Sequence, residues 1–432
     1  MRPRPTELSS LPGGEKPLLP TSQVSSLTSY CPIPKICIFA LQNEFVKMKI
    51  LVVLSRIPFP LEKGDKLRAY YQIRELSKQH DLYLVALYNQ RIPAEAMREL
   101  TPYCREVHFL RQSPLRSVLN MGAALLVGLP VQCGYFYSHR NHKEIDRIIQ
   151  EVQPDRIYCQ LFRMAEYVRH CRIPKVLDYQ DAFSMGMERR AQKAFPLFRP
   201  IMRMEGHRIA HYETDIFDDF EHKTMITALD RDCIQHPMKE EIVIVPNGVD
   251  FAKFSHEEVP KTYDLIFSGN MNYPPNVDAA VYLVKEILPE LRKKHPDVRL
   301  MLAGADPAKK VRALQSEQVT VTGWVPSMTD CYALSRIFIA PMRLGTGLQN
   351  KLLEAMAMRL PCVTSPLAGK PLDPAAEEGA IATCSTTRQY VDALDKLLTD
   401  EEYYRNLAQK GHDFVHERYD WGNATRLLND LF

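Results

Sequence analysis

The sequence lacks the patterns that would build a disulfide framework or bind a metal. It has ten cysteines but no C-x-x-C pair, and several of them lie in apolar runs such as RIYCQLF. Such cysteines are typical of buried thiols in a reducing cytosol. The thirteen histidines include no H-E-x-x-H motif. His207 and His211 stand four apart on an expected helix, but exposed or core histidines explain this pair more simply. We therefore expect no metal site.

The sequence also has no apolar run long enough to span a membrane. The longest runs, MGAALLVGLPV and KILVVL, fall well short of the roughly 20 residues that a spanning helix needs. A formal net charge of +3 over 432 residues argues against an extended nucleic-acid surface. The composition is that of an ordinary globular protein, 45% hydrophobic and 25% charged. These features predict a cytoplasmic protein.

The chain is longer than the roughly 250 to 300 residues that share one core, so we expect two domains. Residues 1–47 are rich in proline and serine, which is typical of a disordered tail. A start codon assigned too early would explain them equally well, because Met48 directly precedes a typical first strand. We expect an N-terminal domain at 48–240, a C-terminal domain at 241–414 and a terminal helix at 415–432 that packs back on the first domain.

Short β-branched runs alternate with helical stretches from Lys49 onward. This alternation predicts an α/β fold with two successive doubly wound parallel sheets. Strands are expected at 49–55, 82–88, 106–110, 156–160, 175–180 and 224–229, and then at 263–269, 299–304, 319–325, 337–342 and 361–366. Helices are expected at 66–78, 95–100, 143–151, 201–221, 277–294, 308–317 and 329–335.

Glycines cluster at the ends of the strands in the second half. In open α/β sheets, ligands bind at the carboxyl edge, where backbone amides can approach an anion. The pattern favours a nucleotide or phosphate site, although each glycine alone would also fit a strand end for steric reasons. The glycines are Gly269, Gly304, Gly323, Gly345 and Gly347.

The stretch RLGTGLQNKLLEAMAMRLPCVTS, residues 343–365, fits neither familiar phosphate loop. It lacks the spacing of G-x-x-x-x-G-K-[ST], and Asn350 replaces the third glycine of G-x-G-x-x-G. What remains is a strand, a Gly-Thr-Gly turn and a helix that begins near Leu348, whose start suits a phosphate or a sugar. Lys351 and Glu354 could instead form a simple surface pair.

Several ordered motifs resemble the retaining glycosyltransferases of family 4, the group 1 transferases with the GT-B fold. They are VPNGVD, IFSGNMNYPPNVDAA, LMLAGADP, VTVTGWVPS and IFIAPMRLGTGLQNKLLEAMAMRLPCVTS. KILVVLSRIPFPLEKGDKLRAYYQIRELSKQHDLYLV adds a matching first strand and loop. The resemblance is closest to a bacterial subgroup associated with exopolysaccharide synthesis. It implies two Rossmann-like domains facing a cleft, with the donor held by the second and the acceptor by the first.

The resemblance also implies roles for the donor-side residues. Glu354 stands where the family places a glutamate on the donor ribose, and Thr346 stands where most members have a second glutamate that touches the sugar. Arg343 and Lys351 are candidates to stabilise the departing diphosphate. The remaining donor-side candidates are Gly269 and Asn270 near the phosphates, Gly323, Trp324 and Val325 beside the base, and Gly345, Gly347 and Leu348 near the sugar. Trp324 could equally be a partly buried aromatic, and the NYPPN turn a rigid connector.

In the first domain, Gly64 lies in the loop after strand one, which borders the donor phosphates and acceptor in the family. The neighbouring charges could equally form a solvated turn. Asp178 and Asp181 lie at the end of a strand, where a carboxylate could orient the acceptor hydroxyl. Helix capping by Asp181 or Ser184 is the simpler alternative.

These inferences predict an enzyme that transfers a sugar from a nucleoside diphosphate-sugar to a glycan or lipid-linked acceptor with retention. The donor is a substrate, so no cofactor is expected. A nucleotide-sugar 2-epimerase of the same fold and a non-catalytic sugar-nucleotide-binding partner remain alternatives. The basic and aromatic run ERRAQKAFPLFRPIMRMEGHR suits peripheral contact with anionic lipid, although most such runs are solvated helix faces.

Overall fold

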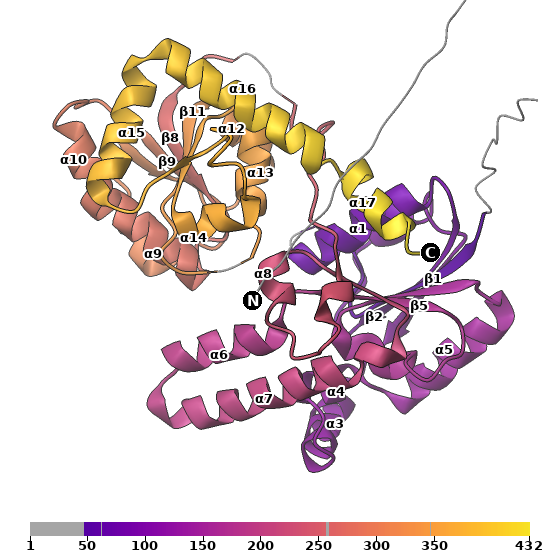
Figure 1. Cartoon of the computed structure of the whole chain (residues 1–432). Coiled ribbons are helices and arrows are strands. Elements are labelled where there is room, and N and C mark those ends of the chain that lie inside the picture. The colour runs from indigo at the N-terminus through magenta and orange to yellow at the C-terminus, as the bar shows by residue number, and fades with distance from the viewer. Residues whose placement is uncertain (1–46, 62, 256–258, 346) are drawn as a thin grey trace, which may run out of the picture. The chain divides into compact units, whose positions relative to one another are not determined.

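A computed structural model describes residues 47–61, 63–255, 259–345 and 347–432. These residues form two α/β domains, each built on a sheet whose strands are all parallel. Apolar side chains fill both domains, with one core cluster in the second domain and two in the first. Figure 1 shows the helices layered against each sheet.

The first sheet has seven strands in the order β3-β2-β1-β4-β5-β6-β7. Its central strands are buried apolar runs, as a parallel sheet covered on both faces requires. The strands are β1 Lys49–Leu54, β2 Asp81–Tyr88, β3 Glu106–Arg111, β4 Arg156–Gln160, β5 Lys175–Gln180, β6 His222–Met225 and β7 Val243–Ile244.

Helices connect these strands, and four of the helices pack together as two pairs. α3 contacts α4, and α6 runs beside α7 as a hairpin (Figure 1). The helices are α1 Gly64–Leu76, α2 Ala96–Leu100, α3 Pro114–Leu126, α4 Val131–Phe136, α5 His139–Val152, α6 Phe183–Lys193, α7 Arg199–Asp215 and α8 Ala228–Arg231. Short 3-10 turns η1 Phe162–Tyr167, η2 Pro196–Phe198, η3 Phe217–Asp219 and η4 Lys239–Glu241 complete the domain.

The second sheet has six strands in the order β10-β9-β8-β11-β12-β13. The strands are β8 Tyr263–Ser268, β9 Leu300–Ala303, β10 Val319–Val321, β11 Ser335–Ala340, β12 Cys362–Thr364 and β13 Ala382–Thr383. The helices are α9 Pro274–Tyr282, α10 Leu288–Arg292, α11 Lys309–Arg312, α12 Met328–Ala333, α13 Asn350–Ala357, α14 Pro366–Gly369, α15 Thr387–Thr399, α16 Glu401–Arg418 and α17 Trp421–Asn429. A π-helical segment, η5 Leu283–Ile287, joins α9 to α10, and a 3-10 turn, η6 Lys370–Leu372, follows α14.

The strands agree with the sequence prediction except at four places. The strand expected at 319–325 ends at Val321 as β10. The strand expected at 224–229 ends at Met225, because Thr227 caps the short helix α8. β7 at 243–244 and β13 at 382–383 were not expected. Among the helices, α3, α4, α6 and the one-turn helices α8 and α14 were missed, and the helix expected near Leu348 begins at Asn350. The helix expected at 201–221 ends at Asp215, and the terminal helix expected at 415–432 is α17, because α16 extends to Arg418.

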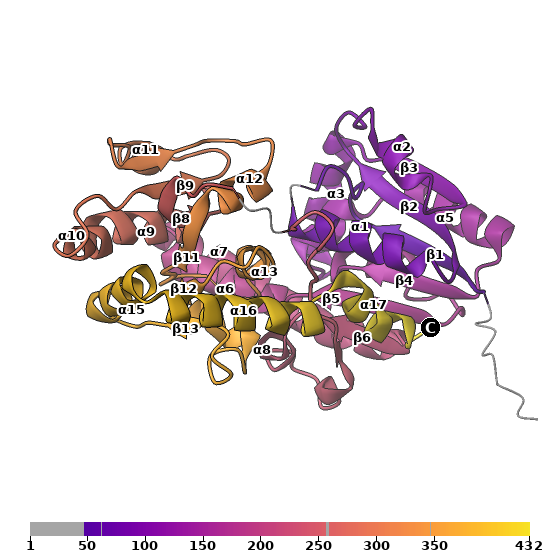
Figure 2. The same cartoon turned by 90° about the horizontal axis from the view of Figure 1, so that it is seen from above.

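The C-terminal helix α17 lies against the first domain. Trp421 stacks on Tyr71 of α1, with ring centroids 5.0 Å apart. Leu428 is fully buried in the same apolar cluster as β1 and α1. Figure 2 shows α16 leading along the second domain into α17. The Val249 N–H also donates to the Tyr419 carbonyl at 2.6 Å, so the linker after β7 runs beside this returning segment.

The loops after β8 and β9 approach each other too closely for a side chain. A Cβ at Gly304, where φ is +142°, would lie 1.9 Å from the Gly269 carbonyl oxygen. We expect Gly304→Ala to unfold or strongly destabilise the second domain, because backbone must move to admit the methyl group. Gly186→Ala in α6 meets nothing within 4 Å and serves as the control. Calorimetric melting of both variants checks this, and a wild-type melting temperature for Gly304→Ala would contradict it.

Candidate donor-binding site

The candidate site lies at the carboxyl edge of the second sheet, between β8 and β11. The strand order reverses there, since β8 leads to β9 on one side and β11 to β12 on the other. Such a switch point is where open α/β sheets bind ligands. The loop that begins at Gly269 follows β8, and the loop with Gly345 and Gly347 follows β11 and precedes α13. The predicted glycine loops therefore meet at one place.

Lys351 is the central charged group of this site. Its Nζ donates to the Asn276 Oδ1 of α9 at 2.6 Å and lies 4.7 Å from the centroid of the Phe267 ring. Gly269 borders it, because a Cβ there would lie 3.2 Å from Nζ and 2.6 Å from the Asn276 amide nitrogen. Burial lowers the pKa of the Lys351 ammonium to about 7, although the Glu354 carboxylate acts in the opposite direction. The ammonium is thus desolvated beside a neutral partner.

Glu354 is half-buried on the same helix and has a partner of its own. Its Oε2 accepts from the Tyr332 hydroxyl at 2.9 Å, and that hydroxyl lies 2.8 Å from the Ser268 Oγ. Burial raises the pKa of Glu354, while Tyr332 and the charge of Lys253 oppose the rise. Lys351 and Glu354 therefore bond to other elements, and the simple surface pair considered for them is not formed.

Arg343 contacts α9 through other residues than Lys351 does. Its guanidinium forms a bidentate pair with Asp278, at 3.0 and 2.9 Å, and lies over the Tyr282 ring at 4.4 Å. Glu286 lies 3.8 Å away. The Asp278 hydrogen bonds raise the pKa of Arg343. The side chain is paired with acidic partners, so it is a weaker candidate for the diphosphate than Lys351.

The turn between β11 and α13 depends on two left-handed glycines, Gly345 at φ +110° and Gly347 at φ +74°. Gly345 lies against Pro275, where a Cβ would be 3.5 Å from the proline Cβ. Leu348 packs partly against the core of the domain. Thr346, predicted to replace the sugar-binding glutamate, lies outside the described residues.

The remaining donor-side candidates follow β8 and β10. The Asn270 carbonyl accepts from the Asn276 amide at 2.9 Å, so it helps to fix the partner of Lys351. Gly323 has φ +69°, and its carbonyl accepts from the Thr322 hydroxyl at 2.7 Å. Val325 packs partly against the core, whereas Trp324 is 70% exposed. The interpretation of Trp324 as a partly buried aromatic is therefore wrong, and its indole is open to a ligand.

In the first domain, Asp178 lies in a closed network. Both of its carboxylate oxygens accept from the Arg68 guanidinium, at 2.7 and 3.0 Å, and both side chains are fully buried. Thr224 and Tyr158 donate to it at 2.8 and 2.9 Å. Asp178 thus accepts four hydrogen bonds from within the domain. We therefore interpret it as a residue that positions its neighbours rather than as a contact for the acceptor.

Asp181 is open to solvent just after β5. A Cβ at Gly347 would lie 3.6 Å from its Oδ1, which places the carboxylate beside the donor-side turn. Desolvation by the surrounding protein, with the charge of Asp230, raises the pKa of Asp181 to about 6. The capping interpretation is wrong, because Glu213 accepts from the Phe183 and Ser184 N–H groups and from the Ser184 hydroxyl.

Gly64 is the first residue of α1, and a Cβ there would meet nothing within 4 Å. Of the charges beside it, Lys63 is exposed, whereas Asp65 is paired within the domain. Asp65 accepts from Arg56 at 2.6 Å and from Arg163 at 3.3 Å, and the Arg163 side chain is nearly buried. Burial and the charge of Arg56 lower the pKa of Arg163 to about 10. Asp65 at the start of α1 thus joins Arg56 of the loop to Arg163 of η1.

Sequence reasoning missed three residues of this arrangement. Asn276 and Tyr332 fix Lys351 and Glu354, and Asn247 accepts from Arg68 at 3.1 Å and donates to Asn350 at 3.2 Å. Asn276 lies in the motif NYPPN and Asn247 in VPNGVD, so these motifs could have indicated both asparagines as residues of the site. The prolines of NYPPN open helix α9, where proline is favoured, so the turn is a helix start.

Within the described ranges, no group of three or more His, Cys, Asp or Glu side chains is placed to hold a metal ion. His207 and His211 are exposed on α7. No helix among the residues described is long and apolar enough to cross a bilayer.

Three known proteins resemble this chain over most of its length. A Klebsiella pneumoniae protein described as an uncharacterized 44.6 kDa protein in cps region is 23% identical over 327 residues, which cover 71% of this chain and 80% of that protein. The structure of Anabaena Alr3699/HepE in complex with UDP and glucose is 12% identical to this chain and has a TM-score of 0.59. The match covers 89% of this chain and 98% of the HepE chain. The structure of a putative UDP-N-acetylglucosamine 2-epimerase from Listeria monocytogenes is 11% identical to this chain and has a TM-score of 0.53. The match covers 88% of this chain and 94% of the epimerase chain.

The sequence model of the family "Glycosyl transferases group 1" matches residues 262–400. This range includes Lys351, Glu354, Asn276 and the glycine loops of the candidate site. The two parallel-sheet domains and the similar structures establish the GT-B fold. Residues 262–400 are therefore similar to group 1 glycosyl transferases, and this similarity supports sugar transfer as the activity.

Proposed function

We propose that this protein is a retaining glycosyltransferase that moves a sugar from a nucleoside diphosphate-sugar to a glycan or lipid-linked acceptor in polysaccharide or glycoconjugate biosynthesis. The observation that carries the proposal is the desolvated ammonium of Lys351, held by Asn276 beside Gly269 at the switch point of the second sheet. The donor is a substrate, and the proposal requires no cofactor.

The site meets the electrostatic demand of the reaction. Breaking the glycosyl–phosphate bond leaves negative charge on the departing diphosphate, and a cation already fixed in a poorly hydrated site stabilises that charge without reorganisation. Lys351 supplies the cation, and the glycine loops at Gly269 and Gly345 allow the backbone to approach the phosphates. Glu354, fixed by Tyr332, accepts from the donor ribose hydroxyls in this proposal.

Asp181 is our candidate for orienting the acceptor. It comes from the first domain, faces the turn at Gly347 and remains open to solvent. In the proposed front-face substitution, the acceptor oxygen bonds to the anomeric carbon as the bond to the diphosphate breaks on the same face. The acceptor proton passes to the leaving phosphate, so the reaction requires no carboxylate nucleophile. Asp181 would hold the hydroxyl in place by accepting its hydrogen bond.

The similar proteins guide the choice of donor and pathway. HepE was crystallised with UDP and glucose, so UDP-sugars are the first donors to test. The Klebsiella relative is described as belonging to a cps region, which agrees with a role in surface polysaccharide synthesis.

The test has two stages on the purified full chain. A thermal-shift screen of nucleoside diphosphates and their sugars identifies the donor, since a ligand that binds only the folded state raises its stability. Proton NMR of the product formed with glycan or lipid-linked acceptors then reports the anomeric configuration, for which we expect retention. An inverted product would contradict the proposal, conversion of donor alone to its 2-epimer would establish the epimerase, and donor binding without turnover on any acceptor would favour a binding partner.

Donor binding should weaken as the pH rises through the pKa of Lys351. This pKa is lowered to about 7, so the ammonium is charged below that pH and must regain its proton to bind the diphosphate above it. We expect the dissociation constant of a nucleoside diphosphate-sugar to increase up to about tenfold per pH unit above 7, until the pKa of the complex is reached. Calorimetric titrations between about pH 6 and 8.5 check this. Lys351→Gln should show weak, nearly pH-independent affinity, and a flat wild-type profile would contradict the assignment.

A further inference from the structure

Exposed apolar side chains are concentrated on α3 of the first domain. This helix buries only Ser117 and Ala124, while its leucines and valines recur at helical spacing on the opposite face. A helix of a globular domain normally turns such a stripe inward. Leu126 is 90% exposed and Leu115 73% exposed. The α3 apolar face consists of Leu115, Val118, Leu119, Leu125, Leu126 and Val127.

A second exposed apolar group lies where α6 connects to α7. Phe195 and Leu197 are each 71% exposed, and Phe198, Ile201 and Met204 continue the group along the start of α7. The same hairpin is basic. Between residues 183 and 208 the sequence has six arginines and lysines but only two acidic residues. The α6–α7 tip, residues 189–204, therefore combines apolar and positively charged side chains.

The two acidic residues of this hairpin are engaged within the protein. Glu205 is buried and accepts from the Val131 N–H at 2.7 Å, and Glu188 lies 3.6 Å from Arg203. The exposed charge of the tip is thus dominated by arginine. α3 itself contains one charged residue, Arg116.

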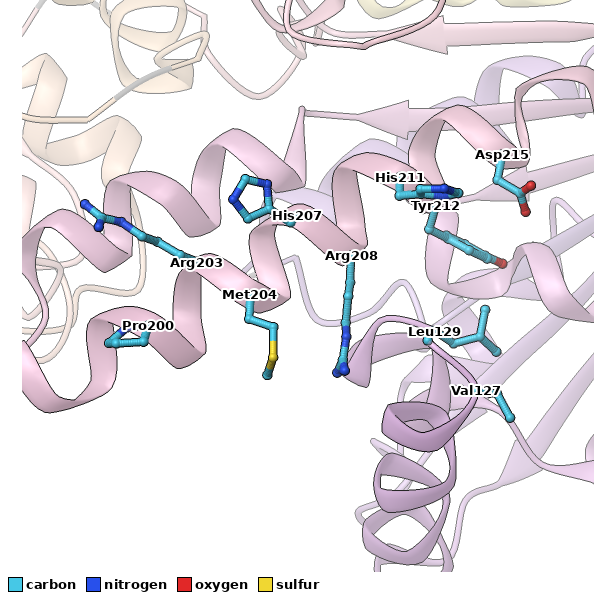
Figure 3. Close-up of a pocket in the computed structure, with 11 residues that line it drawn as sticks. Val127, Leu129, Pro200, Arg203, Met204, His207, Arg208, His211, Tyr212 and Asp215 are labelled. Carbon is cyan, nitrogen blue, oxygen red and sulfur yellow. The ribbon is translucent and has the colours of Figure 1, made fainter.

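The α3 apolar face and the α6–α7 tip are neighbouring parts of one surface. The Arg208 guanidinium of α7 donates to the Leu125 carbonyl of α3 at 3.4 Å. A groove of about 790 Å³ between them is lined by the segment after α3 and by one side of α7. Figure 3 shows the side chains of Arg208 and Met204 pointing from α7 into this groove, and Val127 and Leu129 lining it from the segment after α3. The surface thus continues from one helix to the other.

We propose that the α3 apolar face and the α6–α7 tip together form a docking surface for a bilayer that contains anionic lipid. An exposed apolar patch of this extent marks an interaction site. A bilayer surface accepts leucine and phenylalanine side chains below its headgroups while anionic headgroups attract the arginines. A second copy of this chain fits less well, because a two-fold interface would place the basic tip against itself. The proposal does not depend on the donor site.

Flotation of the full chain with vesicles tests the proposal. We expect binding to phosphatidylcholine vesicles that contain phosphatidylglycerol, weak binding to phosphatidylcholine alone, and loss of binding at high salt. Leu119→Ser/Leu126→Ser and Phe195→Ser/Leu197→Ser should each reduce the partition coefficient by about tenfold or more. Arg199→Gln/Arg203→Gln should reduce it on the order of tenfold for anionic vesicles only. Leu367→Ser/Leu427→Ser, which changes exposed leucines elsewhere, should bind as the wild type does.

Melting temperature and the thermal shift with the identified nucleotide are measured on every variant. Unchanged values show that the fold and the donor site are intact, so a failed docking proposal is distinguishable from a failed donor site. Wild-type binding by both serine double variants, or equal binding to neutral and anionic vesicles, would overturn the proposal. Concentration-dependent dimerisation that Leu119→Ser/Leu126→Ser abolishes, without vesicle binding by the wild type, would assign the surface to a second copy instead.

Discussion

Replacing Lys351 by methionine should reduce kcat for sugar transfer by about a hundred- to a thousandfold, the range found when one fixed electrostatic contact to a developing anion is removed. The reason is that Lys351 is the desolvated cation at the switch point, whereas Arg343 is already neutralised by Asp278. Methionine keeps the length and apolar character of the lysine stem, so packing over Phe267 is retained.

Comparison with three variants makes this prediction specific. Arg343→Gln should lose much less activity, because its charge is shared with acidic neighbours. Asn276→Ala should lie between the two, since it releases the ammonium without removing it. Lys293→Met, an exposed lysine of the same domain, should be unchanged. Steady-state kinetics with the identified donor and acceptor measure all four, and a Lys351→Met enzyme within about threefold of the wild type would remove the lysine from the mechanism.

Replacing Asp178 by alanine should destabilise the first domain by about 3 to 5 kcal/mol. The substitution leaves the fully buried Arg68 without its carboxylate and leaves Thr224 and Tyr158 without an acceptor. For a domain of this size the corresponding fall in melting temperature is roughly 6 to 20 °C. The measurement is the first-domain transition in scanning calorimetry, because a two-domain chain need not melt in one step.

Two controls separate buried charge from lost packing. The double variant Arg68→Met/Asp178→Leu should melt above Asp178→Ala, because it removes both charges and keeps apolar volume. Arg147→Ala, which breaks an exposed ion pair with Glu144, should not change the melting temperature measurably. If the double variant is no more stable than Asp178→Ala, the unpaired guanidinium is not the cause of the loss.

Much of the fold could be predicted from the sequence because buried parallel strands are continuous apolar runs. β1, β4 and β5 are recognisable for this reason, and their order along the chain alternates with helices. β7 and β13 were missed because each is only two residues long. α3 was missed although its leucines and valines recur at helical spacing, so the sequence held a signal for that helix.

The site could be predicted in part for a similar reason. Strand-end glycines and the order of the motifs place Gly269, Gly345 and Gly347 at one sheet edge without knowledge of side chains. The partner of Lys351 could not be found in this way. Local spacing suggests Glu354, three residues away, whereas the actual partner, Asn276, lies 75 residues earlier in the chain. Partners that meet only through the tertiary fold leave no periodic signal.

The place of α17 has a consequence for how the chain can be synthesised and divided. The first domain begins at the N-terminal end of the described chain, yet Leu428 in its core and Trp421 on Tyr71 belong to a segment that is synthesised only after the second domain. The first domain therefore cannot complete its packing until the second domain has been translated, although its sheet is finished at residue 244. A fragment cut after β7 would expose Tyr71 and the pocket of Leu428. A separate first domain should be designed with residues 419–432 reattached by a short linker.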